Sequence, residues 1–269
     1  MIKQEHNTNC SLLQFYYYLL TVAYFTQLIS AYRTDDTMQL TNILKKAIAS
    51  SFTTPALVKQ IKECTEVSRN HMTPEIALHL ITPNCSLWSA KQEESPFHDP
   101  FWAFHWPGGQ ALSRYILDNK ELICGRRILD VGSGCGACSI AAALHNSAEI
   151  IIANDIDEVA CTAIGMNCSV NNVSMEISCE NLIGTPCENI DLIIVGDMFY
   201  DSDFGEIMFS WLKELASNGK YILVGDPGRH AFKDTVLTEQ VQCVIEYTLN
   251  EQSCMENSGF SSTSVWKFM

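Results

Sequence analysis

Hydrophobic and polar positions from residue 127 onward predict strands that alternate with helices. Short apolar runs such as ILDV and LIIVG have the length of buried strands, and the segments between them have helical spacing. This alternation is typical of a mainly parallel sheet covered by helices on both faces. The predicted strands are residues 127–131, 149–154, 175–179, 190–196, 220–225, 242–249 and 262–268, and the predicted helices are residues 136–145, 157–171 and 203–217.

The last two predicted strands have no helix between them, so we expect a hairpin with an antiparallel strand at the edge of the sheet. The expected fold is therefore α/β, with a Rossmann-like seven-stranded sheet that is mostly parallel. Two further helices are predicted upstream. The sequence TPE at residues 73–75 has the composition of a helix N-terminus, and its helix is expected to end before Pro83. The WPGG turn at residues 106–109 leads into the other.

The first 62 residues differ from the rest of the chain and predict a leader, followed by one domain at residues 63–269. Residues 11–32 carry no charge and have the length of a membrane span, but their tyrosines and glutamines weaken that interpretation, and an anchor or secretory signal is an alternative. Residues 37–62 have no acidic side chain and show helical apolar spacing beside lysines, which is typical of a mitochondrial targeting helix. An ordinary N-terminal helix of the domain is the other interpretation. Met38 offers an alternative start, which would make the residues before it an optional extension.

The charge balance limits the partners of the chain. Its net charge is −14, from 17 basic and 31 acidic side chains, and residues 1–62 hold six of the basic and three of the acidic ones. The domain that follows is therefore strongly acidic. Such a surface repels nucleic acids and anionic membranes, so we expect neither as a partner, and it attracts positively charged substrates such as lysine-rich protein surfaces. No coiled coil or sticky edge is evident, and we expect a monomer.

Twelve cysteines are scattered through the chain. A chain of 269 residues buries enough surface to need no disulfide framework, so we expect reduced cysteines and an intracellular protein. Cys135 and Cys138 have the C-x-x-C spacing of zinc and redox sites, but no second pair follows at ligand spacing. We interpret both as structural residues and expect no metal.

The motif with the clearest chemistry is ILDVGSGCG at residues 128–136, which leads into an apolar helix. A strand, a glycine turn and a helix N-terminus bring backbone close to a nucleotide-containing ligand, here around Gly132, Ser133, Gly134 and Gly136. The same glycines satisfy the G-x-G-x-x-A fingerprint of dinucleotide sites, so a nicotinamide oxidoreductase is an alternative.

Asp130 lies two residues before the first glycine and helps to distinguish the two cofactors. Its carboxylate would repel a pyrophosphate, whereas it attracts the ammonium group of S-adenosylmethionine. The position therefore favours S-adenosylmethionine as the cofactor. A buried aspartate that caps the glycine turn is the other interpretation.

Residues after the next two strands complete the predicted cofactor site. Asp155 follows the second strand, where a carboxylate accepts hydrogen bonds from ribose hydroxyls, and Ile156 lies beside it. Asp157 is interpreted as the N-cap of the next helix. Asn181 follows the third strand and is a candidate for the adenine edge, although asparagine in a loop is also a common turn former.

The fourth and fifth strands end in candidate catalytic residues, because ligands bind at the carboxyl ends of the strands in open α/β sheets. Asp197 and Tyr200 follow the fourth strand in the sequence DMFY, and we expect both to project over the reactive end of the cofactor. Phe199 and Tyr200 are expected either to line the site or to pack in a lid. Asp226 and Arg229 follow the fifth strand in GDPGR and either bind substrate or pair with each other.

These stretches resemble the family-16 protein-lysine methyltransferases, a branch of the seven-strand S-adenosylmethionine-dependent methyltransferases. The D-x-x-Y motif of that family is matched by Asp197 and Tyr200, and its upstream tryptophan by Trp106. Other similar stretches include HMTPEIALHLITP, WPGGQALSRYILDN, LDVGSGCGACSIAA, ANDID and ENSGFSSTSVW, so the resemblance covers about residues 70–268. It implies that Trp106 and Asp197 contact S-adenosylmethionine. It also implies methylation of lysines on the β subunit of the electron transfer flavoprotein, in the mitochondrial matrix.

Methyl transfer to lysine is an in-line displacement by a neutral amine, whereas a lysine side chain normally has a pKa of about 10.4. Desolvation beside a sulfonium lowers that pKa, so the protein mainly has to align nitrogen, carbon and sulfur. We expect Asp197 to orient the ammonium group and the rings of Phe199 and Tyr200 to wall the channel, while water carries the proton away. Alternatives are a methyltransferase for another mitochondrial protein or a small molecule, and a non-catalytic module, which would have an eroded glycine turn.

Overall fold

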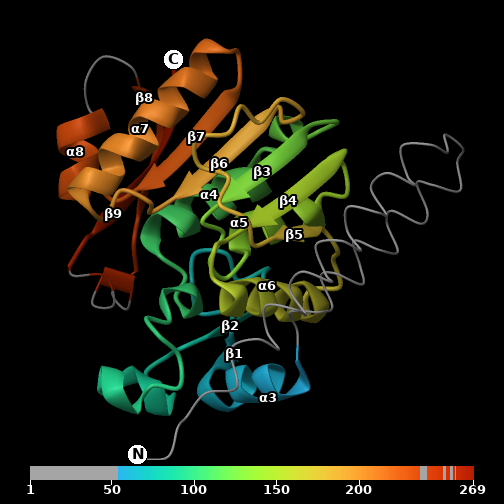
Figure 1. The fold of residues 1–269 in the computed structure, drawn as a ribbon, viewed down its shortest axis with the longest axis vertical. Coiled ribbons are helices and arrows are strands. Elements are labelled where there is room, and N and C mark those ends of the chain that lie inside the picture. The colour runs from blue at the N-terminus through green and yellow to red at the C-terminus, as the bar shows by residue number, and fades with distance from the viewer. Residues whose placement is uncertain (1–53, 237–240, 251–252, 255–256, 258) are drawn as a thin grey trace, which may run out of the picture. The chain divides into compact units, whose positions relative to one another are not determined.

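A seven-stranded sheet forms the centre of the domain in the computed structural model, which describes residues 54–236, 241–250, 253–254, 257 and 259–269 (Figure 1). The strand order is β5-β4-β3-β6-β7-β9-β8, and β9 runs antiparallel to both of its neighbours. The strands are β3 (Arg127–Val131), β4 (Ile150–Asn154), β5 (Glu176–Ser178), β6 (Leu192–Gly196), β7 (Tyr221–Asp226), β8 (Val241–Thr248) and β9 (Ser262–Phe268).

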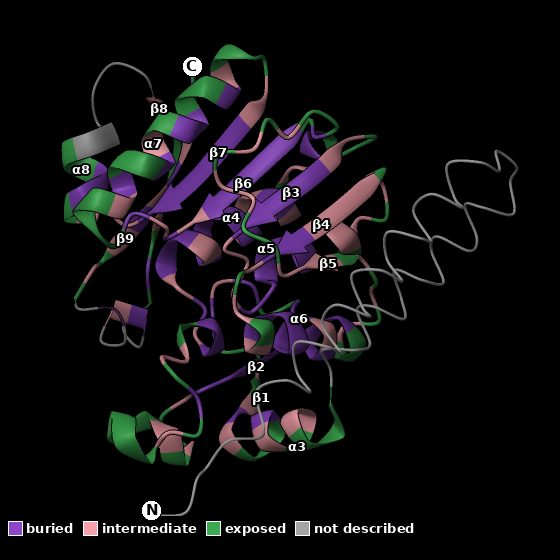
Figure 2. Ribbon diagram, viewed as in Figure 1, coloured by how far each residue is buried: buried purple, intermediate pink, exposed green. Residues whose placement is uncertain are grey.

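Helices cover both faces of this sheet. Along β6, Leu192 and Ile194 belong to one layer of the core, and Ile193 and Val195 belong to the other. The central strands are therefore buried on both sides (purple in Figure 2), and this explains their unbroken apolar runs. The first layer is covered by α4 (Pro107–Asp118), α5 (Ala137–Leu144) and α6 (Glu158–Val170), and the second by α7 (Ser202–Ser217) and α8 (His230–Val236).

The strands and helices predicted from residue 127 onward are confirmed, with ends that differ by a few residues. The C-terminal hairpin is confirmed as well, and its antiparallel strand is β9, which lies between β7 and β8. The helix after the WPGG turn is α4, and it begins at Pro107. The pattern does not predict α8, which follows the GDPGR turn.

The helix predicted between residues 73 and 83 is wrong. The segment instead contains β2 (Leu78–Leu80), which pairs antiparallel with β1 (Glu66–Ser68). All three residues of β2 are buried, and N of His79 donates to Oδ1 of Asn167 in α6 at 2.7 Å. Burial and a hydrogen bond that β2 donates to a distant helix thus override the local signal for a helix start.

Helix α3 (Pro55–Cys64) begins before the predicted domain boundary. Its buried Ile61 packs in an apolar cluster with residues of α6. This part of the predicted leader therefore belongs to the folded domain, whereas residues 37–53 of the stretch interpreted as a targeting helix or an ordinary N-terminal helix lie outside the described residues. The other leader predictions, on residues 11–32 and on a start at Met38, fall outside the described residues. Within the described part of the chain, no helix has the length and apolar character to cross a bilayer.

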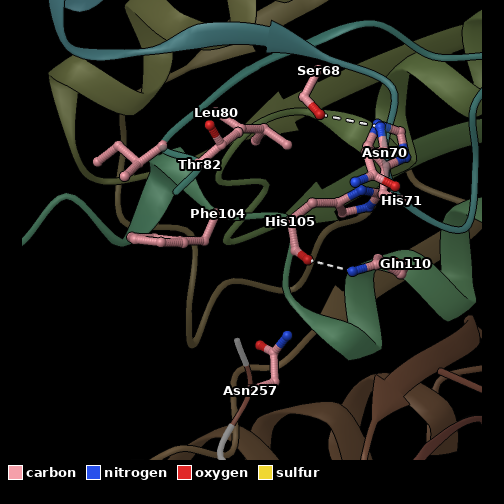
Figure 3. A pocket seen from close by; sticks show the side chains of 10 residues that line it. Ser68, Asn70, His71, Leu80, Thr82, Phe104, His105, Gln110 and Asn257 are labelled. Carbon is pink, nitrogen blue, oxygen red and sulfur yellow. Dashed lines mark hydrogen bonds between the residues drawn. The ribbon is translucent and has the colours of Figure 1, made fainter. Parts of the chain in front are cut away.

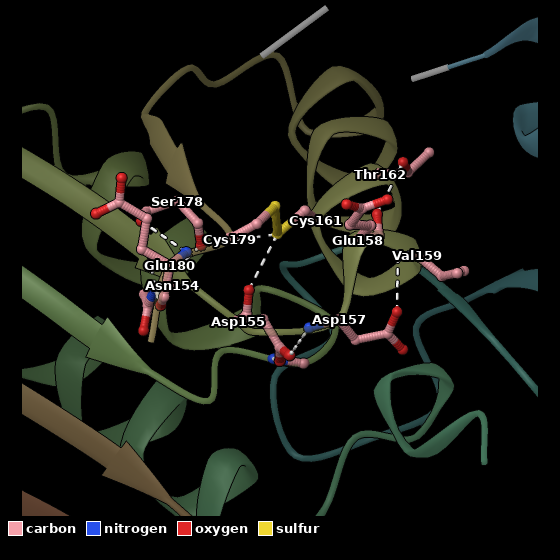
Figure 4. Close-up of a disulfide and its surroundings, with 11 residues drawn as sticks. Asn154, Asp155, Asp157, Glu158, Val159, Cys161, Thr162, Ser178, Cys179 and Glu180 are labelled. Atoms are coloured by element: carbon pink, nitrogen blue, oxygen red, sulfur yellow. Dashed lines mark hydrogen bonds between the residues drawn. A yellow bond between two sulfur atoms is a disulfide. The ribbon is translucent and has the colours of Figure 1, made fainter. Parts of the chain in front are cut away.

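The structure joins Cys161 to Cys179 in a disulfide (Figure 4). Cys161 lies in the first turn of α6 and Cys179 directly follows β5, and their Cα atoms are 6.4 Å apart, a separation that a disulfide spans. The prediction that all cysteines are reduced is therefore wrong for this pair. Cys135 and Cys138 are free and buried, and burial raises the pKa of the Cys135 thiol to about 12, as suits a structural residue.

Candidate active site

The carboxyl ends of four neighbouring parallel strands bring the candidate residues to one edge of the sheet. The glycine turn follows β3, Asp155 follows β4, Asp197 follows β6, and Asp226 ends β7. Because these strands end side by side, residues that are far apart in the sequence become neighbours here. The structure therefore gathers the predicted residues of all four strands at one edge.

The glycine turn connects β3 to the N-terminus of α5, and three of its residues carry no side chain. Gly132, Gly134 and Gly136 have φ values of 64°, 55° and 80°, which glycine adopts without the penalty that other residues carry. A Cβ on Gly132 would collide with Sδ of Met198. Both the conformation of the turn and its close contacts thus require glycine, as they do where backbone approaches a nucleotide-containing ligand.

Asp130 braces this turn from within. It is only 2% exposed, and its Oδ2 accepts hydrogen bonds from Oγ of Ser133 at 2.6 Å and from N and Oγ of Ser139 at 3.1 and 2.7 Å. Burial raises the pKa of the carboxyl, and these hydrogen bonds oppose the rise. The geometry supports the interpretation of a buried aspartate that shapes the turn, while its contact with an ammonium group stays a prediction.

Asp155 connects the end of β4 to the glycine turn. Its Oδ2 accepts from N of Gly134 at 2.9 Å. Its Oδ1 accepts from N of Asp157 at 3.0 Å (Figure 4). Burial raises the pKa of this carboxyl. The adjacent Ile156 is 71% exposed. An acceptor next to an exposed apolar side chain suits a nucleoside, which presents hydroxyls on its ribose and a flat apolar face on its base.

Two residues in the same region serve the backbone. Asp157 is the N-cap of α6 and accepts from N of Val159 at 2.8 Å, which confirms its interpretation. Asn181 is exposed after β5, and its Oδ1 accepts from N of Ile183 at 3.1 Å. This contact is that of a turn former, and the predicted contact of Asn181 with adenine stays a prediction.

Asp197, which we expect to project over the reactive end of the cofactor, is a buried carboxylate with a partner on each oxygen. It is 7% exposed, its Oδ2 accepts from N of Gly109 at 2.9 Å, and its Oδ1 accepts from Nη2 of Arg229 at 2.9 Å. Burial raises the pKa of the carboxyl, and Arg229 counteracts that rise. The backbone N–H at the start of α4 and the guanidinium of Arg229 stabilise the buried carboxylate, because a buried charge needs such partners. Direct orientation of a lysine by Asp197 stays a prediction.

Asp226 and Arg229 do not form the side-chain pair that was one of their two alternatives, and substrate binding, the other, stays a prediction. Oδ1 of Asp226 accepts from N of Gly228 and N of Arg229, both at 2.7 Å, whereas the guanidinium of Arg229 turns to Asp197. Asp226 is 1% exposed, and its Oδ2 has no hydrogen-bond partner among the described residues. Burial raises the pKa of Asp226 to about 7, and the nearby carboxylate of Asp197 adds to the rise.

Aromatic rings border this ion pair. Trp106 is the N-cap residue of α4, its Nε1 donates to O of Phe101 at 2.9 Å, and its ring centroid lies 5.7 Å from Cζ of Arg229. Tyr200 is 66% exposed and stacks on Phe204 with ring centroids 5.3 Å apart. Both predicted aromatic residues therefore lie at the edge of the site, and their contacts with cofactor or lysine stay predictions.

Phe199 does not wall a channel, and that prediction is wrong. Its ring is fully buried and packs edge-on against Phe232 of α8, with centroids 5.3 Å apart. In the turn between β6 and α7, Phe199 points into the core beneath the two helices, whereas Tyr200 faces solvent. Packing, the alternative for Phe199, is what the structure supports.

Sequence reasoning misses three residues of this site. Met198 lies over the glycine turn, Ser139 donates to Asp130, and Gly108 lets α4 approach β7 so closely that a Cβ would meet the carbonyl oxygen of Gly225. The serine in an otherwise apolar helix and the paired glycines of WPGG are signals for two of them. Nothing in the sequence indicates the place of Met198.

A small pocket lies beside the start of α4 (Figure 3). Its lining includes His71, His105, Gln110 and Asn257. The volume of about 30 Å³ suits a single water molecule and is far below that of a cofactor site. Burial lowers the pKa of His71 to about 4, so this imidazole is neutral at physiological pH. We therefore interpret the pocket as structural.

The residues at the edge of the sheet fit S-adenosylmethionine. The glycine turn offers close backbone approach at the N-terminus of α5, Asp155 offers an acceptor for hydroxyls, and Ile156 offers an apolar surface for a base. Among the described residues, no cluster of three or more side chains is arranged to hold a metal ion.

Comparisons with known proteins agree with these features. A family model described as lysine methyltransferase matches residues 102–241. Proteins named electron transfer flavoprotein beta subunit lysine methyltransferase are similar along most of their length. The Xenopus laevis protein is 43% identical over 77% of this chain and 85% of its own length. The human protein is 43% identical over 82% of this chain and 85% of its own length. A homolog from Caenorhabditis elegans is 39% identical over 79% of this chain and 96% of its own length. Among solved structures, the putative methyltransferase SMU.776 complexed with SAH has a TM-score of 0.47 and 12% identity, over 62% of this chain and 50% of that chain.

Proposed function

The chain belongs to the lysine methyltransferase family, and from this premise we propose that it methylates lysines on the β subunit of the electron transfer flavoprotein. Like its family, it uses S-adenosylmethionine as the methyl donor. The substrate proposal is carried by 43% identity to proteins named for that reaction. The net charge of −14 supports it, because an acidic surface attracts a lysine-bearing partner.

Two groups of residues have different roles in the site: one binds the methyl donor, and the other positions the start of α4 and Trp106. The glycine turn, Asp155 and Ile156 bind the nucleoside end of the donor, and Asp130 keeps the turn in shape through Ser133 and Ser139. The second group is built around Asp197 and Arg229, which hold the start of α4 and the ring of Trp106 beside the same edge.

S-adenosylmethionine supplies a methyl group bound to a positively charged sulfur. The Nζ atom of the substrate lysine would attack the methyl carbon as a neutral amine, with the sulfur leaving as an uncharged thioether. The lysine enters as an ammonium group and loses its proton to water once desolvation in the site has lowered its pKa. Both oxygens of Asp197 have partners and its charge is paired with Arg229, so this carboxylate acts by positioning the start of α4 and the guanidinium. The exposed ring of Tyr200 lines the approach of the lysine.

The proposed function is tested by methyl transfer with the full chain. The protein is incubated with labelled S-adenosylmethionine and the recombinant flavoprotein, and the β subunit is analysed by mass spectrometry. Asp155→Ala removes the acceptor beside the glycine turn, and we expect at least about a tenfold loss of kcat/KM. Glu214→Ala removes an exposed carboxylate of α7 and serves as the matched control. Donor binding without transfer to this subunit would refute the substrate and leave another protein or a small molecule as the alternative.

We also propose that the chain acts in the mitochondrial matrix. The basic stretch at residues 37–62 and the flavoprotein named in its relatives support this location. A reporter fused to residues 1–54 is expected to enter mitochondria, and Lys45→Glu with Lys46→Glu is expected to reduce import. A reporter that stays in the cytosol would contradict the proposal.

A further inference from the structure

Aromatic side chains form a continuous surface next to the Asp197–Arg229 pair. We name Trp88, Phe101, Phe104 and Trp106 the aromatic patch. The ring centroids of Trp88 and Phe104 are 6.3 Å apart, those of Phe104 and Trp106 are 5.4 Å apart, and those of Phe101 and Trp106 are 6.3 Å apart. Phe101 is 63% exposed and Trp88 is 38% exposed. A connected set of large rings that faces solvent is typical of a contact surface.

The patch borders both parts of the site. The ring of Trp106 lies 5.7 Å from Cζ of Arg229, the partner of Asp197. In the same segment, Cα of Trp102 lies 3.8 Å from the place that a Cβ of Gly134 would take in the glycine turn. A molecule bound on the patch is therefore next to the edge of the sheet where the methyl group is transferred.

Acidic side chains are exposed on both segments that border the site. Glu93 and Glu94 form part of the 3-10 helix η2 (Gln92–Glu94), which lies between Trp88 and Phe101 in the sequence, and Asp201 and Asp203 follow Tyr200 at the start of α7. An apolar centre with an acidic rim complements a partner that has an apolar anchor among basic residues.

We propose that the aromatic patch docks the folded protein substrate, with an apolar side chain of the substrate on Phe101 and Trp88 and its lysines facing the acidic rim. This inference rests on the proposed function, because it assigns the docking surface of the same reaction. Aromatic residues supply much of the binding energy of protein interfaces. A small substrate would be held at the edge of the sheet and would leave these outer rings without a role.

The test compares Trp88→Ala/Phe101→Ala with Trp88→Phe/Phe101→Tyr, which keeps the rings, and with Leu144→Ala, which removes an exposed apolar side chain at the far end of α5. Affinity of the intact β subunit and kcat and KM of its methylation are measured, together with S-adenosylmethionine affinity and thermal unfolding. We expect the double alanine variant to raise Kd and KM for the subunit about tenfold or more, with kcat at saturation and donor affinity unchanged. The ring-keeping variant and Leu144→Ala are expected to match the wild type.

The outcomes separate docking from catalysis. Unchanged Kd and KM in the double alanine variant, with transfer intact, would overturn docking and leave the proposed function. Binding that depends on the patch without any transfer would overturn the proposed function and leave docking. A dimer of the chain that dissociates in the double alanine variant would assign the patch to a second copy and overturn the proposal.

Discussion

Asp197 is the residue at which the contacts of the site converge. Its carboxylate joins the backbone of Gly109 in α4 to the guanidinium of Arg229, and its φ of 56° is unusual for a residue other than glycine. Strained conformations of this kind persist only where surrounding contacts hold them, and they concentrate at functional sites. The acid of the D-x-x-Y motif is thus a positioning residue in this structure.

The coupling between Asp197 and Arg229 can be measured by a double-mutant cycle. Arg229→Gln leaves a buried carboxylate without its cation, so we expect a loss of about 3 kcal/mol in the free energy of unfolding. Asp197→Asn in the same chain removes the uncompensated charge, so the double variant should lose less than the sum of the single variants. Urea unfolding of the four proteins provides the measurement, and additive losses would show that the two side chains act independently.

At the scale of elements, the packing of α4 on β7 places Asp197 and Trp106 beside the site. Gly108 and Gly225 meet backbone to backbone, since a Cβ on either would collide with the carbonyl oxygen of the other. This close approach lets N of Gly109 reach the carboxylate of Asp197. The paired glycines after Pro107 therefore serve packing between a helix and a strand as well as the turn itself.

We expect Gly108→Ala to destabilise the protein by about 2 kcal/mol or more, because backbone atoms of β7 cannot move aside as a flexible side chain does. Gly109→Ala is the matched control. Its Cβ would meet Cδ2 and Nε2 of His105 at 3.6 and 3.9 Å, which are ordinary contacts, and its N still donates to Asp197. Denaturant midpoints of the two variants test this, and equal stability would contradict the close-packing argument.

At the scale of the whole molecule, the ionisation of Asp226 makes folding depend on pH. Burial raises its pKa to about 7, so the folded state binds this proton more tightly than the unfolded state does. The contribution of Asp226 to stability therefore falls as the pH rises from about 4 to about 7 and stays low above that range. His71 acts in the opposite direction, because burial lowers its pKa to about 4 and stability from that group rises with pH.

Asp226→Asn isolates this effect, because asparagine resembles the protonated acid in shape and does not titrate. We expect the melting temperature of the variant to exceed that of the wild type by a margin that grows from pH 5 to pH 8, by about 5 °C. Asp203→Asn, at an exposed position in α7, is the control for the loss of one negative charge. A difference between wild type and Asp226→Asn that does not change with pH would contradict the buried carboxyl as its cause.

Elements with a strong local pattern were predictable from the sequence. Apart from α8, the strands and helices from β3 onward and the hairpin follow from hydrophobic period and glycine placement, because short-range geometry decides which side chains share a face. The predicted helix before Pro83 failed for the converse reason. Its residues become β2 through burial and through the hydrogen bond that N of His79 donates to Asn167 of α6. Both depend on segments that are distant in the sequence.

The candidate site likewise has features that the sequence determines and features that depend on the tertiary structure. The sequence by itself determined the glycine turn, the acidic residues at the strand ends and the acidic character of the domain, since each follows from residue type and spacing. Only the tertiary structure decided that Asp197 binds Arg229, that Phe199 points inward and that Met198 lies over the turn. The partner of a buried group is chosen by whichever donors and charges the packed strands bring within reach, and spacing along the chain does not contain that information.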